Sequence, residues 1–237
     1  MTKLEKFMES LYNEPEIQEL YSNKKKNRND LLQAIALVIL TYTVVNDAMS
    51  LSEKEYKKEY ALLTGLIVKL IRANIKAETS IINNVLEKTA KKVFEEYSYN
   101  AGLKEIKKII EANFKGKHFS DRVWDNEQET AKRLKKQINE FLRGKINVNE
   151  IKKDIEKTFN TSAYNSKRLV ETEISRVAND SFRRFCKETG VKKVKRNAIL
   201  DSNTCSDCAE LDGKIYDLKD MPQVSHPLCR CFFTIVD

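Results

Sequence analysis

Glycine and proline are scarce in this 237-residue chain, which has six glycines and three prolines. A turn-rich β protein needs many more of these residues, so their scarcity argues against that class. Charged residues make up 33% of the sequence and hydrophobic residues 41%. The hydrophobic content is too high for a disordered chain, and the mixture favours long helices with solvated faces. We therefore predict a mainly α-helical protein.

Long apolar runs are also lacking. The most apolar stretch, residues 31–45, includes Gln33, Thr41 and Thr43, whereas a membrane-spanning helix needs about 20 predominantly apolar residues. The N-terminal residues, MTKLEKFMES, lack the apolar centre of a secretion signal. We expect residues 31–47 to form a helix buried on most sides, and we expect no membrane span.

Capping residues and glycines mark where the expected helices begin and end. Ser50 or Ser52, and also Asn147, have glutamate three residues later, which is the spacing of a capping box. Gly144 and Gly190 stand where a helix commonly ends on a left-handed glycine. We expect a short N-terminal helix, an exposed basic loop over residues 24–28, and helices over residues 31–47, from 50 or 52 onward, 79–97, 103–114, 120–142, 147–159 and 163–189.

The pattern of the sequence changes after Gly190. Residues 191–200 alternate between apolar and basic side chains as a strand does, and residues 215–216 and 231–236 are expected to add two short strands. Asp212-Gly213 is a hairpin turn signal. We therefore predict an α+β class in three parts: a helical N-terminal region (residues 1–114), a second helical region (residues 115–190) and a small β-rich Cys/His module (residues 191–237). We expect Trp124 to be a core residue of the second region.

Positive charge is distributed unevenly along the chain. Residues 1–196 hold 40 Lys and Arg against 28 Asp and Glu, a balance of +12, whereas residues 197–237 hold 3 against 7, a balance of −4. The densest basic segment sets seven cations against one acid, Glu188: Arg183, Arg184, Lys187, Lys192, Lys193, Lys195 and Arg196. Such a patch could bind double-stranded DNA or an acidic partner. The alternative is a solvated helix end followed by an edge strand that lysines protect.

Cysteine is concentrated at the end of the chain, where four of the five cysteines fall in the last 33 residues. An odd, clustered set argues against the disulfide framework of a small secreted protein. Cys205-x2-Cys208 and His226-x2-Cys229 offer two pairs of ligands for a tetrahedral zinc site, and Cys231 offers a fifth candidate. The fourth ligand is His226 or Cys231, and disulfides or free thiols are the alternatives to metal. A structural zinc ion would stabilise a module that is too small to be held by its core alone.

A catalytic zinc site would keep one coordination position open for water, with an acid close by. Glu210 and Asp212 are near in the sequence but lie where a turn is expected, and the second histidine, His118, belongs to a different segment. We therefore expect no enzyme and no small-molecule substrate. The alternative to a structural protein is a zinc-supported nucleic-acid-binding protein or nuclease.

The C-terminal motifs resemble those of a known family. The segments TCSDCAELDG (residues 204–213) and HPLCRC (residues 226–231) are similar to the C-terminal signature of the phage Mu F-like minor head proteins, the phage head morphogenesis family. The segment RLVETEISR (residues 168–176) is similar to the family's Arg-Thr-Glu helix, although Glu171 stands where arginine is usual. The resemblance covers roughly residues 115–237.

This resemblance implies a structural minor head protein of a tailed phage or prophage, acting in head morphogenesis and in DNA packaging or delivery. It implies the portal protein, the major capsid protein or both as partners, with double-stranded DNA as a further candidate. It implies a place in the head interior of the virion, near the portal. It also implies synthesis in the bacterial host cytoplasm, where reduced thiols can take metal.

Overall fold

The computed structural model describes residues 2–236, which divide into two compact units. We call them the bundle unit (Gln18–Ser80 and Ser120–Ser166) and the module unit (Met1–Ile17, Ile81–Phe119 and Lys167–Asp237). Four helices contribute residues to both units: α2 (Pro15–Thr41), α3 (Glu53–Glu96), α5 (Phe119–Leu142) and α6 (Val148–Glu188). Within the described residues, no helix is both long and apolar enough to cross a membrane. The domain boundaries at residues 114 and 190 stay predictions.

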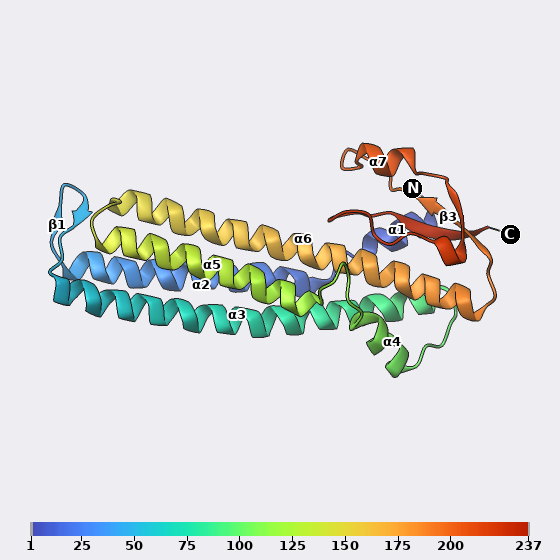
Figure 1. Ribbon diagram of the computed structural model, residues 1–237, viewed down its shortest axis with the longest axis horizontal. Helices are drawn as coiled ribbons and strands as arrows, with labels where there is room; N and C mark the ends of the chain where they lie inside the picture. The colour runs from blue at the N-terminus through green and yellow to red at the C-terminus, as the bar shows by residue number, and fades with distance from the viewer. Residues whose placement is uncertain (1, 237) are drawn as a thin grey trace. The chain divides into compact units, whose positions relative to one another are not determined.

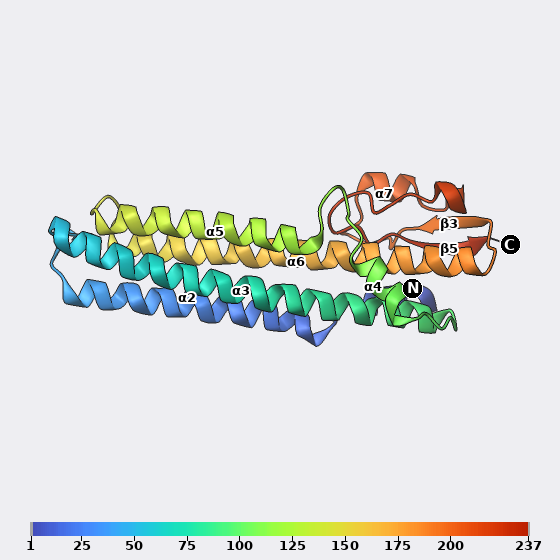
Figure 2. The ribbon, with the colours of Figure 1, turned by 60° about the horizontal axis from the view of Figure 1, so that its bottom comes forward.

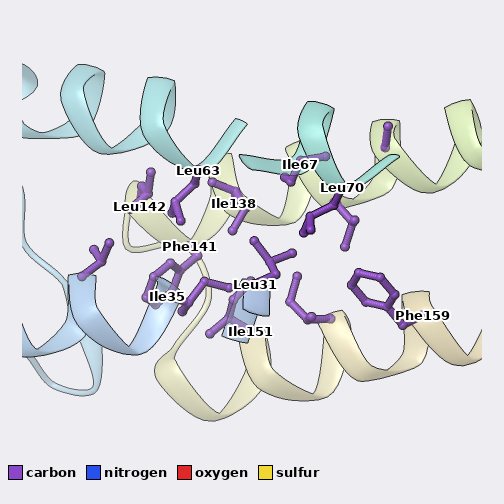
Figure 3. Close-up of a cluster of buried hydrophobic side chains, with 14 of the residues drawn as sticks. Leu31, Ile35, Leu63, Ile67, Leu70, Ile138, Phe141, Leu142, Ile151 and Phe159 are labelled. Carbon is purple, nitrogen blue, oxygen red and sulfur yellow. The ribbon is translucent and has the colours of Figure 1, made fainter. Parts of the chain in front are cut away.

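The bundle unit is built from four helices that run side by side, α2, α3, α5 (Phe119–Leu142) and α6 (Figure 1, Figure 2). A hairpin of β1 (Val44–Val45) and β2 (Ala48–Met49) joins α2 to α3. Each helix turns a stripe of apolar side chains inward (Figure 3). Members of this core include Leu31, Ile35, Leu63, Ile67, Ile138, Phe141, Ile151 and Phe159. Apolar spacing of three and four residues therefore produces a helical core, as the sequence predicts.

The capping residues act as predicted. The Ser52 backbone N–H donates to Glu55 Oε2 at 2.8 Å, and the Glu55 N–H donates to Ser52 Oγ at 3.4 Å, which completes a capping box at the start of α3. At the start of α6, Asn147 Oδ1 accepts the backbone N–H three residues later at 2.9 Å. Gly144 follows α5 with a φ of 67°, and a Cβ there would lie 2.7 Å from the Met49 carbonyl oxygen. Only glycine fits where this turn meets the β1–β2 hairpin.

Two predicted helix breaks are wrong. The sequence predicts separate helices over residues 79–97 and 163–189, but α3 and α6 pass through both expected breaks without interruption. No glycine or proline lies at either point to stop the helix. At the second point, the polar side chains are satisfied locally, because Thr161 Oγ1 donates to the Lys157 carbonyl at 2.9 Å.

The helix expected over residues 31–47 is shorter and less buried than predicted. It forms the end of α2, which stops at Thr41 before the hairpin. Leu37 and Leu40 are 60% and 83% exposed, so one side of this stretch faces solvent. Trp124 is 53% exposed and does not anchor the core, because it lies on the outward side of α5.

The basic run at residues 24–28 is part of α2 and not an exposed loop, and it brings Lys24 into the bundle interior. The Lys24 ammonium lies 2.9 Å from a Glu78 carboxylate oxygen and also pairs with Glu127. Its third contact is the Ser162 hydroxyl at 3.0 Å. These four side chains are almost fully buried, and each comes from a different helix. The lysine is tolerated inside because two carboxylates compensate its charge.

The module unit contains a three-stranded antiparallel sheet in the order β4-β3-β5. Its strands are β3 (Lys193–Asn197), β4 (Ile215–Asp217) and β5 (Phe232–Val236). Three short helices and a 3₁₀ turn accompany the sheet: α1 (Lys3–Ser10), α4 (Leu103–Ile110), α7 (Ser206–Glu210) and η1 (Leu218–Asp220). β3 is the central strand and not an edge, since β4 and β5 pair with it on both sides. Asp212-Gly213 leads from α7 into β4 and does not close a hairpin.

Glu173 and Arg176 form a buried ion pair on α6, with 2.6 Å between Arg176 Nε and Glu173 Oε2. Arg176 also donates to the carbonyl oxygens of Ile109 at 2.9 Å and Ile110 at 3.2 Å, at the C-terminal end of α4. A cation at this position adds hydrogen bonds to the last carbonyls of the helix and interacts favourably with the helix dipole. The ion pair therefore fixes α4 to α6. The mainly α fold with a small β-rich module is confirmed.

Candidate metal centre

Two of the candidate ligands come from the start of α7. Cys205 is the N-cap residue of this helix, and its Sγ accepts the Cys208 backbone N–H at 3.4 Å. The spacing of three residues puts both sulfur atoms on the same side of one helical turn. Local helix geometry alone therefore supplies the first pair of ligands.

The other candidates lie on the segment that leads into β5. The backbone N–H of Cys229 donates to the His226 carbonyl at 3.3 Å, which closes a tight turn. Two side chains of α6 hold this turn: Thr172 Oγ1 accepts the N–H of the residue before Cys229 at 3.2 Å, and Asn179 Nδ2 donates to the Cys231 carbonyl at 3.1 Å. The second set of ligands is thus anchored on a long helix.

The five candidate side chains lie around one small cavity. His226 Nε2 lies 3.1 Å from both Cys205 Sγ and Cys208 Sγ, and the Sγ atoms of Cys208 and Cys229 are 3.7 Å apart. Two groups of ligand atoms, each lying within 4.8 Å of one another, share Cys208: Cys205, Cys208 and His226, and Cys208, Cys229 and Cys231. All five side chains line one cavity of about 20 Å³, which is room for a single small ion or water molecule.

The donor set fits a tetrahedral metal site. With zinc–sulfur bonds of about 2.3 Å, two sulfur ligands of a tetrahedron lie about 3.8 Å apart, close to the 3.7 Å between Cys208 and Cys229. His226 Nδ1 lies 2.8 Å from the Pro227 carbonyl oxygen. Donation of the ring proton to that carbonyl leaves Nε2 able to bind metal, the usual arrangement of a ligating histidine. All five cysteines of the chain are free thiols.

The thiols of the cluster differ in acidity. A hydrogen bond with Cys231 lowers the pKa of Cys229 to about 5, and the same contact raises the pKa of Cys231. Burial raises the pKa of Cys208 to about 11, and the Cys208 backbone N–H lowers the pKa of Cys205. Cys229 is therefore the thiol that most readily carries negative charge.

Arg196 reaches the cluster from β3. Its side chain is 2% exposed, and its NH2 group lies 3.4 Å from Cys231 Sγ and 3.5 Å from Cys208 Sγ. The sequence-based prediction that Arg196 belongs to a solvent-facing basic patch is therefore wrong. The period-two alternation of β3 places Arg196 on the same face as the buried Val194, and this alternation is the sequence signal that indicates its burial.

The remaining cations of the predicted patch fall into two groups. Four lysines are exposed: Lys187, Lys192, Lys193 and Lys195. Arg183 and Arg184 are partly buried and already have partners. Arg183 donates to the Met221 carbonyl at 2.8 Å, and Arg184 pairs with Glu105 and Glu188. The lysines are thus the members of the patch that are best placed to reach a partner.

Two lysines of α4 extend this basic surface. Lys104 and Lys108 line a groove of about 610 Å³ together with Arg183, Arg184 and Lys187. Sequence reasoning misses this neighbourhood because α4 lies far from the end of α6 along the chain.

The acids near the cluster in sequence do not join it. Within residues 2–236, neither metal-ligand group includes His118, Glu210 or Asp212. Asp212 Oδ1 accepts the Ala198 backbone N–H at 2.8 Å, and Glu210 is exposed.

Comparison with known proteins identifies this part of the chain. Residues 124–234 match the protein family described as Phage Mu protein F like protein. The match begins on α5 and ends on β5, so it includes Arg196 and all five candidate ligands. No curated protein and no solved structure matches the chain. Over residues 124–234, the chain is therefore similar to the phage Mu F-like protein family.

Proposed function

We propose that this chain is a structural minor head protein of a tailed phage or prophage, acting in head morphogenesis and in DNA packaging or delivery. The family match over residues 124–234 carries the proposal. Its partners are the portal protein, the major capsid protein or both. Its place is the head interior near the portal, after synthesis in the bacterial host cytoplasm. Its role is structural and not enzymatic.

This role is tested in the phage or prophage that encodes the chain. Purified heads should contain the protein, and chemical crosslinking should join it to the portal or capsid protein. Deletion of its gene should give particles that assemble abnormally or fail to deliver DNA, as seen by electron microscopy and infection assays. A protein that is missing from purified virions and dispensable for infectivity would contradict the proposal.

We further propose that the Cys/His cluster holds one structural zinc ion. Cys205, Cys208 and Cys229 are the proposed thiolate ligands, and His226 or Cys231 is the fourth. Four sulfur or nitrogen ligands with no open position are typical of structural zinc. Bound there, zinc would tie the start of α7 to the turn anchored on α6. A three-stranded sheet with a small core gains stability from such a connection.

The exposed lysines are the proposed contact with DNA or an acidic partner. Lys193 and Lys195 point to the same face of β3, and Lys187 and Lys192 are exposed close by in the sequence. Since each phosphate contact contributes about −0.9 to the salt dependence of duplex binding, reversing Lys192, Lys193 and Lys195 to glutamate should flatten the slope by about three. Duplex DNA binding that does not depend on salt would exclude phosphate contacts.

The nuclease alternative makes a different prediction. A zinc-supported nuclease should cleave plasmid DNA in the presence of Mg²⁺ or Mn²⁺. The activity should disappear in His226→Ala while the fold, followed by circular dichroism, stays intact. A structural head protein should show no cleavage above that of a mock purification.

A further inference from the structure

The burial of Arg196 lacks the compensation that a guanidinium normally has. The side chain is 2% exposed, and a buried charge is costly unless an opposite charge compensates it. Arg176, which is buried to the same degree, pairs with Glu173 and Asp180. Within residues 2–236, no carboxylate pairs with Arg196. Among the described residues, its side chain donates to Cys208 Sγ, Cys231 Sγ and Ser225 Oγ, at 3.5, 3.4 and 3.1 Å.

Sulfur is therefore the source of the missing counter-charge. A neutral thiol is only a weak acceptor and has no net charge, whereas a thiolate carries a full negative charge. Thiolates that bind a divalent metal keep part of this charge. Three thiolates and one neutral imidazole around a divalent ion have a formal charge of −1, and four thiolates have a formal charge of −2. One arginine neutralises the first set completely and the second only in part.

We propose that Arg196 is the counter-charge of an anionic metal–thiolate centre, and that this balance makes His226 the fourth ligand beside Cys205, Cys208 and Cys229. The inference rests on the proposed zinc site and specifies its ligands. Neutrality matters here because Cys208, Cys229 and Arg196 are all buried, where an uncompensated charge is costly.

Cys231 then lies beside the centre as a thiol. Its sulfur accepts a hydrogen bond from Arg196, and its carbonyl is held by Asn179. His226 is already oriented for the role of ligand, since its Nε2 faces the sulfurs of Cys205 and Cys208. The charge balance and the orientation of the imidazole thus favour the same set of ligands.

Arg196 acts as a positioning residue. Its backbone N–H donates to the Lys214 carbonyl at 2.9 Å, and its carbonyl accepts the Gly213 N–H at 2.8 Å. β5 pairs with β3 on the other side, where Phe233 is opposite Arg196. The guanidinium therefore starts from a backbone that is fixed on both sides.

The counter-charge role is tested by zinc affinity, measured in the full-length protein by competition with a chelator. Arg196→Met removes the charge, and zinc affinity should fall about 10- to 100-fold, as for other residues that support metal ligands. Arg196→Lys keeps the charge and should recover most of the affinity. Lys195→Met is the matched control, because Lys195 is the exposed neighbour on the opposite face of β3, and its affinity should equal that of the wild type.

The ligand assignment is tested by the visible absorption of the cobalt-substituted protein, in which the sulfur-to-cobalt charge-transfer intensity counts thiolate ligands. Cys231→Ser should leave this intensity unchanged, whereas His226→Gln should alter the spectrum and weaken binding. A four-thiolate spectrum that loses intensity in Cys231→Ser would overturn the assignment.

The possible failures are distinguishable. Zinc affinity that is unchanged in Arg196→Met would overturn the counter-charge role, while a wild-type chain that binds no zinc would overturn the proposed zinc site itself. If Arg196→Met folds only in excess zinc, the role is supported. If Arg196→Met does not fold at all, the zinc affinity of Arg196→Lys distinguishes the two cases. Tight zinc binding by Arg196→Lys supports the counter-charge role, and loss of zinc binding in Arg196→Lys contradicts it.

Discussion

Replacing Lys24 with methionine tests the buried charge cluster of the bundle unit. Methionine keeps much of the length and apolar contact of lysine but lacks the ammonium, so Glu78 and Glu127 would remain buried without their cation. Removing one partner of a buried ion pair costs about 3–5 kcal/mol. We expect the free energy of unfolding of the bundle unit to fall by about this amount.

The destabilisation caused by Lys24→Met should depend on pH. Burial raises the pKa of Glu78 above its ordinary value. The contribution of Glu78 to stability is therefore complete below the ordinary carboxyl pKa and is lost as the pH rises through the raised pKa. In Lys24→Met, no cation offsets the two carboxylates. The cost of the substitution should be largest where Glu78 is ionised and should shrink in acid, as Glu78 takes up a proton.

Urea unfolding followed by tryptophan fluorescence measures the effect. Trp124 is the only tryptophan and lies on α5, three residues before Glu127, so it reports on the bundle unit. Lys25→Met is the matched control, since Lys25 is the exposed neighbour of Lys24, and it should change the free energy by no more than about 0.5 kcal/mol. Equal unfolding midpoints and slopes for the two variants would refute the reasoning.

Other predictions concern single contacts. Gly144→Ala should destabilise the bundle unit by more than about 1 kcal/mol, because its Cβ would meet the Met49 carbonyl. Gly65→Ala, in open space within α3, should instead stabilise the bundle unit by about 0.5–1 kcal/mol. If urea unfolding shows Gly144→Ala to be the more stable of the two variants, the turn geometry is contradicted. Arg176→Met should speed hydrogen exchange in α4 by releasing its C-terminal carbonyls, and unchanged exchange there would contradict the capping role. Chelation of zinc under reducing conditions should speed hydrogen exchange in α7 and β5 while the Trp124 fluorescence stays constant. Hydrogen exchange that is unchanged, or that rises uniformly along the chain, would argue against a zinc ion that stabilises the module unit locally.

Capping residues and left-handed glycines predict several ends of helices correctly. The capping box at Ser52, the cap at Asn147 and the left-handed glycines Gly144 and Gly190 depend only on neighbouring residues, and the structure has each of them. The Cys205–Cys208 pair also depends only on neighbouring residues, because Cys-x2-Cys needs one turn of helix to bring two sulfurs together.

Two of the predictions that differ from the structure depend on residues far apart in sequence. Lys24 is buried because Glu78 and Glu127 come from two other helices of the bundle unit, and no local pattern within residues 24–28 indicates those partners. Arg196 is buried because β3 is the central strand of the sheet, with β4 paired on one side and β5 on the other. Its position among the basic residues suggests a surface role, and only the sheet register brings it to the sulfurs.

The zinc content of freshly purified, reduced protein tests the central claim most directly. Inductively coupled plasma mass spectrometry should find one equivalent of zinc per chain. Cys208→Ser should lose the metal, since Cys208 belongs to both groups of ligand atoms, and Cys186→Ser should keep it, since Cys186 belongs to neither. Less than about half an equivalent in the wild-type protein, or equal zinc in the two variants, would contradict a metal-stapled module.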